Sequence, residues 1–204
     1  MAIISNAVTI ADAGAFSVSL GSMVHIKTLT ASASATLSFV DGTDGVVLDS
    51  TYPIYKFEFI NCHPATSGFI TFQVNAVGQT GFNETITSTF FHAYHDEADD
   101  NASLTYDTGR DQAQSTSFCK IGFRTGNGAD ESTSGDMFLF NPSSTTYVKH
   151  FITRFASYDT GSYTDNAHVA GYINTTSAIN EIQFKFDSGN IDAGKIKLYG
   201  IKDS

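Results

Sequence analysis

The sequence predicts an all-β protein: an antiparallel, jelly-roll-like β-sandwich of about ten strands, preceded by a short N-terminal arm. Apolar and polar residues alternate at a period of two along most of the chain, most clearly over residues 180–201. No segment carries a long helical stripe, and the best candidate, residues 88–98, lacks apolar residues after Tyr94. The 17 Phe and absence of Trp favour a core of aromatic rings packed between sheets.

Residues 1–22 differ from the rest and are expected to form an arm or edge hairpin that docks on another molecule. Ala, Ser, Ile and Gly dominate there, and residues 8–10 and 16–20 alternate without many large side chains. A first strand of the same sandwich is an equally weighted alternative. The predicted division is an arm at 1–22 and a β-sandwich domain at 23–204.

Alternating segments between turn signals predict the strands of this domain in order. They are residues 24–29, 35–40, 55–60, 69–74, 117–123, 136–140, 147–155, 168–173, 180–187 and 195–201. Residues 85–91 are a strand or a short turn. Residues 95–117 are expected to be irregular because they are polar, and Pro64 with Gly68 is expected to break the chain between two strands.

The charge balance argues against nucleic acid as a partner, and the short apolar stretches argue against membrane insertion. The net charge is −10, whereas binding to phosphate backbones depends on Lys and Arg. No apolar stretch approaches the ~20 residues of a membrane span, so membrane insertion is not expected. The first residues lack the basic start of a signal peptide, and synthesis in the cytoplasm of a host cell is expected.

Cys62 and Cys119 are the only cysteines, and both lie in apolar, strand-like surroundings. One bridge between them is arithmetically allowed, but disulfide scaffolds are short and rich in cysteine. Two buried free thiols are therefore predicted.

The most site-like segment is residues 90–100, in which His92, His95, Asp96 and Glu97 are candidate metal ligands. On a helix or turn the two imidazoles would share one side, whereas on a strand they would point to opposite faces. The segment has no Gly at the place a calcium loop needs. A solvated acidic loop is the favoured interpretation, and no metal or other cofactor is predicted. The polar segment 127–136 is interpreted in the same way, as an exposed loop.

No catalytic residues are predicted. There is no Gly-x-Ser-x-Gly nucleophile elbow, and neither cysteine has a sequence signal for a partner histidine. A glycosidase needs two facing carboxylates, and nothing in the sequence pairs any two of Glu58, Glu181 and Asp187. Tyr106, Tyr158 and Tyr163 lie in Gly- and Asp-rich segments and are candidate contacts for a glycan or a receptor.

Several segments together resemble a known group of proteins. They are residues 46–61, 63–66, 140–151, 169–180 and 188–201, and the last ends in Gly-Lys-Ile-Lys-Leu-Tyr-Gly-Ile. They are similar to poorly characterised virion structural proteins, of decoration or fibre type, from marine tailed bacteriophages. The resemblance covers about residues 24–201, leaves the arm outside, and offers no catalytic residues to carry over.

The resemblance implies a non-enzymatic component on the virion surface: a capsid decoration protein or a fibre or tail appendage. Its expected partners are further copies of itself, as a homotrimer, and other virion proteins of the capsid or tail. The low charged fraction of 16% suits neighbours in an assembly. Two alternatives remain: a receptor-binding, lectin-like tail-fibre module that contacts host-surface glycan, and a glycan-degrading enzyme.

Overall fold

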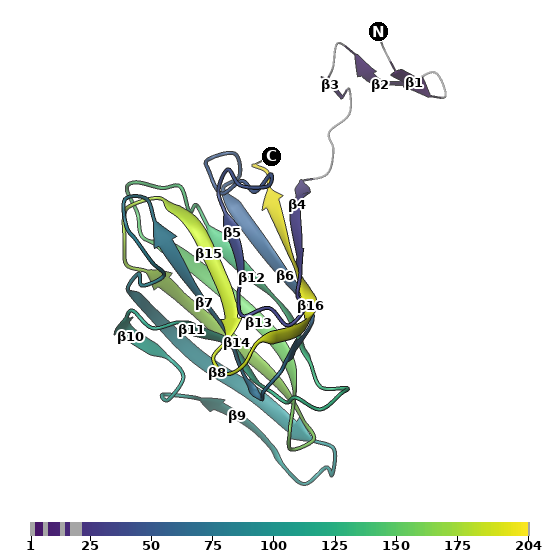
Figure 1. Cartoon of the computed structure of the whole chain (residues 1–204), viewed down its shortest axis with the longest axis vertical. Coiled ribbons are helices and arrows are strands. Elements are labelled where there is room, and N and C mark those ends of the chain that lie inside the picture. Colours follow the sequence, from purple (N-terminus) through teal and green to yellow (C-terminus); the bar gives the residue numbers. More distant parts are fainter. Residues whose placement is uncertain (1–2, 6–7, 13–14, 17–21, 204) are drawn as a thin grey trace.

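The computed structural model describes residues 3–5, 8–12, 15–16 and 22–203, and it is built of strands (Figure 1). Across these ranges there is no helix that could span a membrane. The strands are β1 Ile3–Ser5, β2 Val8–Asp12, β3 Ala15–Phe16, β4 Met23–Thr30, β5 Leu37–Val40, β6 Ile54–Pro64, β7 Gly68–Ala76, β8 Ile86–Asp96, β9 Ala102–Tyr106, β10 Gln112–Ser115, β11 Cys119–Thr125, β12 Thr133–Phe140, β13 Lys149–Asp159, β14 Tyr163–Ile173, β15 Ile179–Phe186 and β16 Ile191–Ile201.

Eight of these strands form a jelly roll. In the larger sheet β4, β16, β6 and β12 are successive neighbours, and β5, β15, β7 and β11 form the smaller sheet, all antiparallel. Along the chain, β4 to β7 switch sheets at every step, as do β11 to β12 and β15 to β16. This order, in which late strands return between early ones, is the double Greek key of a jelly roll. The predicted fold class is confirmed.

Two insertions enlarge one sheet only. The segment β8–β10 enters between β7 and β11, and β13–β14 enters between β12 and β15. Both add to the free side of β12, so the larger sheet has the order β10-β8-β14-β13-β12-β6-β16-β4, with β9 also paired to β8. These five added strands bring the sandwich to thirteen rather than about ten. The inner face of the added part packs against β11, and the candidate site lies there.

The core is a set of aromatic rings between the two sheets. Phe184 of β15 packs with its ring centroid 5.2 Å from Phe57 and 5.0 Å from Phe59, both on β6. Phe72 of β7 meets Phe151 of β13 at 4.9 Å. All five side chains are buried. These inward rings occupy alternate positions of their strands, as the period of two predicts.

The N-terminal strands form a sheet of their own. β2 lies between β1 and β3, and none of the three pairs with a described strand of the sandwich (Figure 1). Residues 17–20, part of the alternation noted above, lie outside the described residues. The sandwich begins with β4 at Met23, and the backbone N–H of Lys202 donates to the carbonyl of Ser22.

Several boundaries differ from the predicted ones for physical reasons. Residues 86–91 belong to an 11-residue strand, β8, which runs on to Asp96. The segment 95–117 contains β9 and β10, and β9 is exposed at every position, so its sequence has no inward apolar set to alternate. β6 extends to Pro64 and ends there. Proline has no backbone N–H to donate to a neighbouring strand, so it is tolerated at the end of a strand.

Both thiols are free and buried, as predicted: Cys62 in β6 and Cys119 in β11. Burial raises the pKa of each thiol to about 12. Because the thiolate is the reactive form, neither cysteine is set up as a nucleophile.

Gly135 is a position where the sheet has no room for a side chain. It lies in β12 opposite Phe155 of β13, and an added Cβ would stand 2.3 Å from the carbonyl oxygen of Arg154. Gly135→Ala is expected to lower the free energy of unfolding by about 1–3 kcal/mol, because backbone must shift. Urea unfolding of this variant and of Gly109→Ala, whose Cβ would meet only a side-chain oxygen at 3.3 Å, provides the measurement. Equal losses in both would contradict the steric argument.

Candidate functional site

A pocket of about 240 Å³ opens where the added part of the larger sheet meets β11. Its lining residues are His92 and Tyr94 from β8, Phe123 from β11, Asp159 from β13, and Tyr163 and Asp165 from β14. β8 and β14 are neighbours in register, with Asp165 opposite Tyr94. Because alternate residues of a strand share one face, the two strands present these four side chains on the same side of the sheet.

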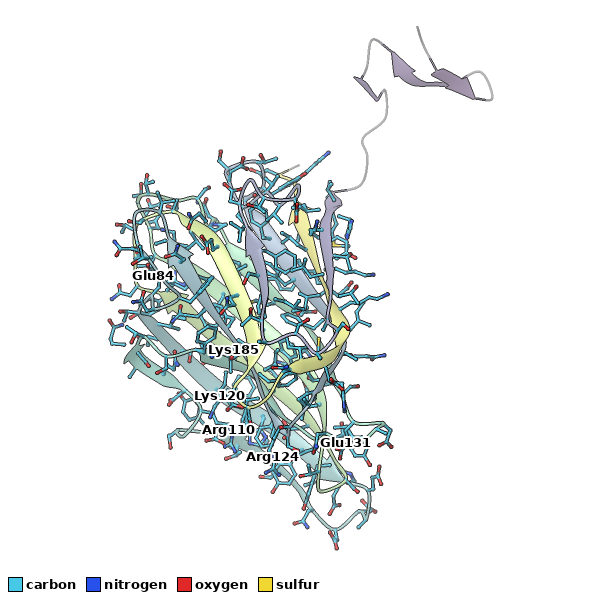
Figure 2. The ribbon with its side chains drawn as sticks, in the orientation of Figure 1. Glu84, Arg110, Lys120, Arg124, Glu131 and Lys185 are labelled. Atoms are coloured by element: carbon cyan, nitrogen blue, oxygen red, sulfur yellow. The ribbon has the colours of Figure 1, made fainter. Side chains whose placement is uncertain are left out.

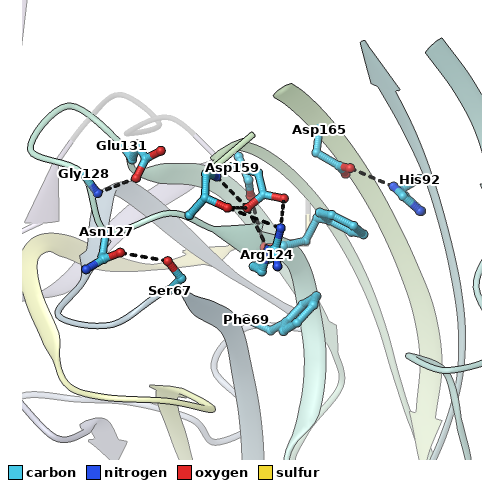
Figure 3. Close-up of polar contacts among 12 residues, drawn as sticks. Ser67, Phe69, His92, Arg124, Asn127, Gly128, Glu131, Asp159 and Asp165 are labelled. Atoms are coloured by element: carbon cyan, nitrogen blue, oxygen red, sulfur yellow. Dashed lines mark hydrogen bonds and ion pairs between the residues drawn. The ribbon is translucent and has the colours of Figure 1, made fainter. Parts of the chain in front are cut away.

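The most deeply buried polar contact in the pocket joins His92 to Asp165 (Figure 3). The Nδ1 atom of His92 lies 2.8 Å from Oδ2 of Asp165, whose side chain is 1% exposed. Burial raises the pKa of Asp165 to about 6, although the hydrogen bond from His92 lowers it. The second oxygen, Oδ1, is buried and accepts no hydrogen bond from any described residue.

Phe123 stands between the histidine and an arginine. The His92 ring stacks on Phe123 with centroids 4.2 Å apart and an interplanar angle of 18°. The Arg110 guanidinium lies 4.7 Å from the Phe123 centroid and pairs with Asp107. Asp107 Oδ2 is also 4.0 Å from His92 Nε2. The segment between β9 and β10 thus contributes one ion pair that adjoins His92.

Asp159 carries a second ion pair, with Arg124 of β11 (Figure 3). Arg124 Nε donates to Oδ1 at 2.8 Å and a terminal guanidinium nitrogen donates to Oδ2 at 2.9 Å. The backbone N–H of Thr160 donates to Oδ1 at 2.7 Å, and its hydroxyl is 3.2 Å away. Both oxygens of Asp159 are therefore engaged in hydrogen bonds, and its role is structural. Arg110 and Arg124 lie close together at the same end of the molecule (Figure 2).

The structure does not bring the four metal candidates together. β8 remains a strand through His92 and His95, so the first is buried inside and the second lies on the outer face, 3.1 Å from Asp99. Asp96 accepts hydrogen bonds from the backbone N–H groups of the following turn. Glu97 accepts one from the Tyr158 hydroxyl. In the described ranges no group of three or more His, Cys, Asp or Glu is placed to hold a metal ion.

The loop that joins β11 to β12 closes on itself and on the turn between β6 and β7. Glu131 accepts a hydrogen bond from the backbone N–H of Gly128, and Ser67 donates to the Asn127 side chain at 2.9 Å (Figure 3). The loop oxygens are therefore used locally.

The three tyrosine candidates belong to different surfaces. Tyr163 lines the pocket, with its ring 5.6 Å from Tyr94 at an interplanar angle of 80°. Tyr158, on the adjacent β13, points to the outer face and donates to Glu97 at 3.2 Å. Tyr106, at the end of β9, is 51% exposed and donates to Asp111 at 2.6 Å. Only Tyr163 joins the candidate site.

The carboxylates considered for glycan cleavage do not face one another. Glu58 lies on β6 of the larger sheet and accepts from Lys56 and Tyr199. Glu181 is on β15 of the smaller sheet, and Asp187, just beyond β15, accepts the backbone N–H of Phe69.

Five of the residues that build the site were not identified from the sequence: Arg110, Phe123, Arg124, Asp159 and Asp165. One signal was present. The inward positions of β13 are Phe151, Thr153 and Phe155, and the same parity then reaches Ser157 and Asp159. When polar residues occupy the next inward-facing positions of an alternating strand, they are expected to be buried polar groups. The predicted strand ended at residue 155, so this signal was lost.

Comparisons with protein-family models, with curated proteins and with solved structures give no match.

Proposed function

We propose that this chain is a non-enzymatic structural component of the outside of a tailed-phage virion, as a capsid decoration protein or a fibre or tail appendage. The observation that carries the proposal is a jelly-roll body whose N-terminal strands pair with none of its described strands. Jelly rolls build viral capsids and also lectin domains, so this support is an analogy at the level of the fold. The resemblance over residues 24–201 points the same way.

The N-terminal strands are suited to attachment. β1, β2 and β3 use one another as partners, and the peptide N–H and C=O groups on the free sides of β1 and β3 are available to a neighbour. Adding strands to the edge of another sheet supplies main-chain hydrogen bonds with little demand on sequence. We place attachment to a capsid or tail protein in residues 1–22.

An apolar patch on the outer face supports self-association. Leu104 and Tyr106 of β9 are 72% and 51% exposed, and Phe91, opposite Tyr106 on β8, is also exposed. These three side chains share one face at an edge of the larger sheet. Exposed apolar residues that cluster in this way mark contact surfaces. A closed homotrimer built through this edge is part of the proposal.

The pocket supports binding rather than catalysis. Glycoside hydrolysis needs two carboxyl groups free to act on the substrate, and both oxygens of Asp159 are occupied by Arg124 and Thr160. Asp165 then remains as a single carboxyl group with a free oxygen. The described lining residues include no serine, threonine or cysteine to serve as a nucleophile beside His92.

Deletion of residues 1–22 is expected to leave the sandwich folded and to abolish incorporation into particles. The reason is that no described strand of the sandwich needs β1–β3 as a partner. Thermal unfolding with circular dichroism would test whether the deletion protein folds. Co-sedimentation of the deletion protein and of the full chain with phage particles would test incorporation. A matched chain carrying Leu104→Asp, with the arm intact, is expected to bind particles but to lose self-association. Failure of the deleted protein to fold would show that the arm belongs to the core.

One observation favours a second candidate, a receptor-binding, lectin-like module that contacts host-surface glycan. The pocket combines tyrosine rings with a buried carboxylate oxygen that lacks a donor. Such a module would occupy the same place on a particle, and the two candidates differ in whether the pocket has a ligand.

A further inference from the structure

We propose that the pocket between β8, β11, β13 and β14 binds a single neutral sugar unit, with Asp165 as its central hydrogen-bond acceptor and Tyr94 and Tyr163 as its walls. Sugar binding deepens the second candidate function, and it rests on that function rather than on attachment to a particle.

One carboxylate oxygen of Asp165 has no hydrogen-bond donor among the described residues. Asp165 is 1% exposed, and its Oδ2 atom is fixed by His92, which leaves Oδ1 buried at the pocket without a donor. A buried acceptor without a partner costs about 1–3 kcal/mol, more when it is charged. The site therefore gains from any ligand that brings an O–H or N–H group to Oδ1. Such a group would make a charge-assisted hydrogen bond.

The charged groups around the pocket favour a neutral ligand. Asp159 is neutralised by Arg124 and Asp107 by Arg110, while Asp165 accepts a hydrogen bond from His92 Nδ1. Each carboxylate around the pocket already has its own partner. The guanidinium groups of Arg110 and Arg124 adjoin the pocket and oppose a permanently cationic ligand, whereas an anionic ligand meets Asp165 and Asp159 directly. A neutral hydroxyl group needs one free lone pair, and Oδ1 provides it.

The walls and volume of the pocket suit one sugar ring. The Tyr94 and Tyr163 rings stand nearly perpendicular, at 80° with centroids 5.6 Å apart, and form a corner beside Asp165. The His92 ring stacks on Phe123 and lies 5.9 Å from the Tyr94 ring, so Tyr163 offers the aromatic surface that His92 does not cover. A pyranose ring has an apolar C–H face that packs on an aromatic ring and hydroxyl groups at its rim. The volume of about 240 Å³ corresponds to roughly eight water molecules, which is room for one sugar ring.

The experiment uses the full chain and a panel of methyl glycosides of glucose, galactose, mannose, fucose and N-acetylglucosamine, with choline as a cationic probe. Binding is measured by saturation-transfer NMR and by titration calorimetry. At least one glycoside is expected to bind, and choline is expected not to. Tyr163→Ala and Asp165→Asn are each expected to weaken that binding by about tenfold or more, as loss of one wall or one charged hydrogen bond implies.

Tyr158→Ala is the matched control, because Tyr158 lies on the neighbouring strand but on the opposite face of the same sheet. It is expected to bind the glycoside as the unchanged protein does, and circular dichroism of all three variants verifies that they fold. The proposal is overturned if no glycoside binds, if choline binds through Tyr163, or if Tyr158→Ala weakens binding while Tyr163→Ala does not. Because free protein is used, failure here leaves particle attachment unaffected, and failure of attachment leaves the binding result standing.

Discussion

Phe184→Ala is expected to lower the free energy of unfolding by about 3–5 kcal/mol, the range for a fully buried phenylalanine truncated to alanine. Phe184 lies in β15, at the centre of the smaller sheet, and its ring contacts the rings of Phe39, Phe57 and Phe59. Three edge-to-face contacts and the burial of the ring are lost together. The cavity would open between the two sheets, where the backbone ladders on both sides limit collapse. Urea unfolding followed by circular dichroism provides the measurement.

Phe91→Ala is the comparison for this prediction. Phe91 is a phenylalanine of the same sandwich, but it lies on the outer face of β8 and is 41% exposed. Its loss is expected to cost no more than about 1 kcal/mol. If the two variants unfold at the same urea concentration, the ring cluster around Phe184 is not the core of the fold.

Asp165→Asn is expected to change how stability depends on pH. The pKa of Asp165 is about 6 in the folded protein, against 3.8 for an ordinary aspartate. The folded state therefore binds more protons than the unfolded state between about pH 4 and pH 6, and stability falls as the pH rises through this window. Above it, the buried carboxylate lowers stability by an amount on the order of 3 kcal/mol. His92, Asp159 and Arg110 are the titratable and charged groups that act on the Asp165 carboxylate, and all three are retained in the variant.

The stability of Asp165→Asn relative to the unchanged protein is therefore expected to rise by about 2 kcal/mol between pH 4 and pH 7.5. Urea unfolding at closely spaced pH values would measure this difference. Asp99→Asn is the control for loss of an exposed carboxylate, since the Asp99 side chain is 91% exposed, and it is expected to change the free energy of unfolding by no more than about 0.5 kcal/mol. A difference that falls with rising pH in Asp165→Asn would mean that the carboxylate is stabilised by its surroundings. Such a result would remove the argument that its free oxygen awaits a ligand.

The architecture was open to prediction because its strands alternate. Phe57, Phe59 and Phe184 occupy inward positions that repeat at a period of two, and β13 alternates in the same way along its length. The added strands were harder to predict. β9 is exposed along its whole length, and β8 ends in a polar, acidic segment. β8 is placed by its pairing with β14, and β9 by its pairing with β8. The first of these pairings is long-range information that no local pattern carries.

The site shows the same limit more sharply. His92 was identified as a candidate, but for a metal site with His95, and the strand places these two imidazoles on opposite faces. Its actual partner, Asp165, is 73 residues away in the sequence. The pairing follows from the register of β8 against β14, and alternation fixes which face a side chain takes without fixing which residue stands opposite. Arg110 and Arg124 reach the pocket from a loop and from β11 for the same reason.

The position of β16 has a consequence for how the protein matures. It lies between β4 and β6 in the larger sheet. The pairing of β4 with this sheet is therefore made through β16, residues 191–201. During translation, β4 and β6 must wait with bare edges until this segment has left the ribosome. Closing a sheet across so long a stretch of chain is slow, and bare edges invite wrong partners in the meantime. Nascent chains stalled before residue 191 should therefore be a target for chaperones that shield exposed strands.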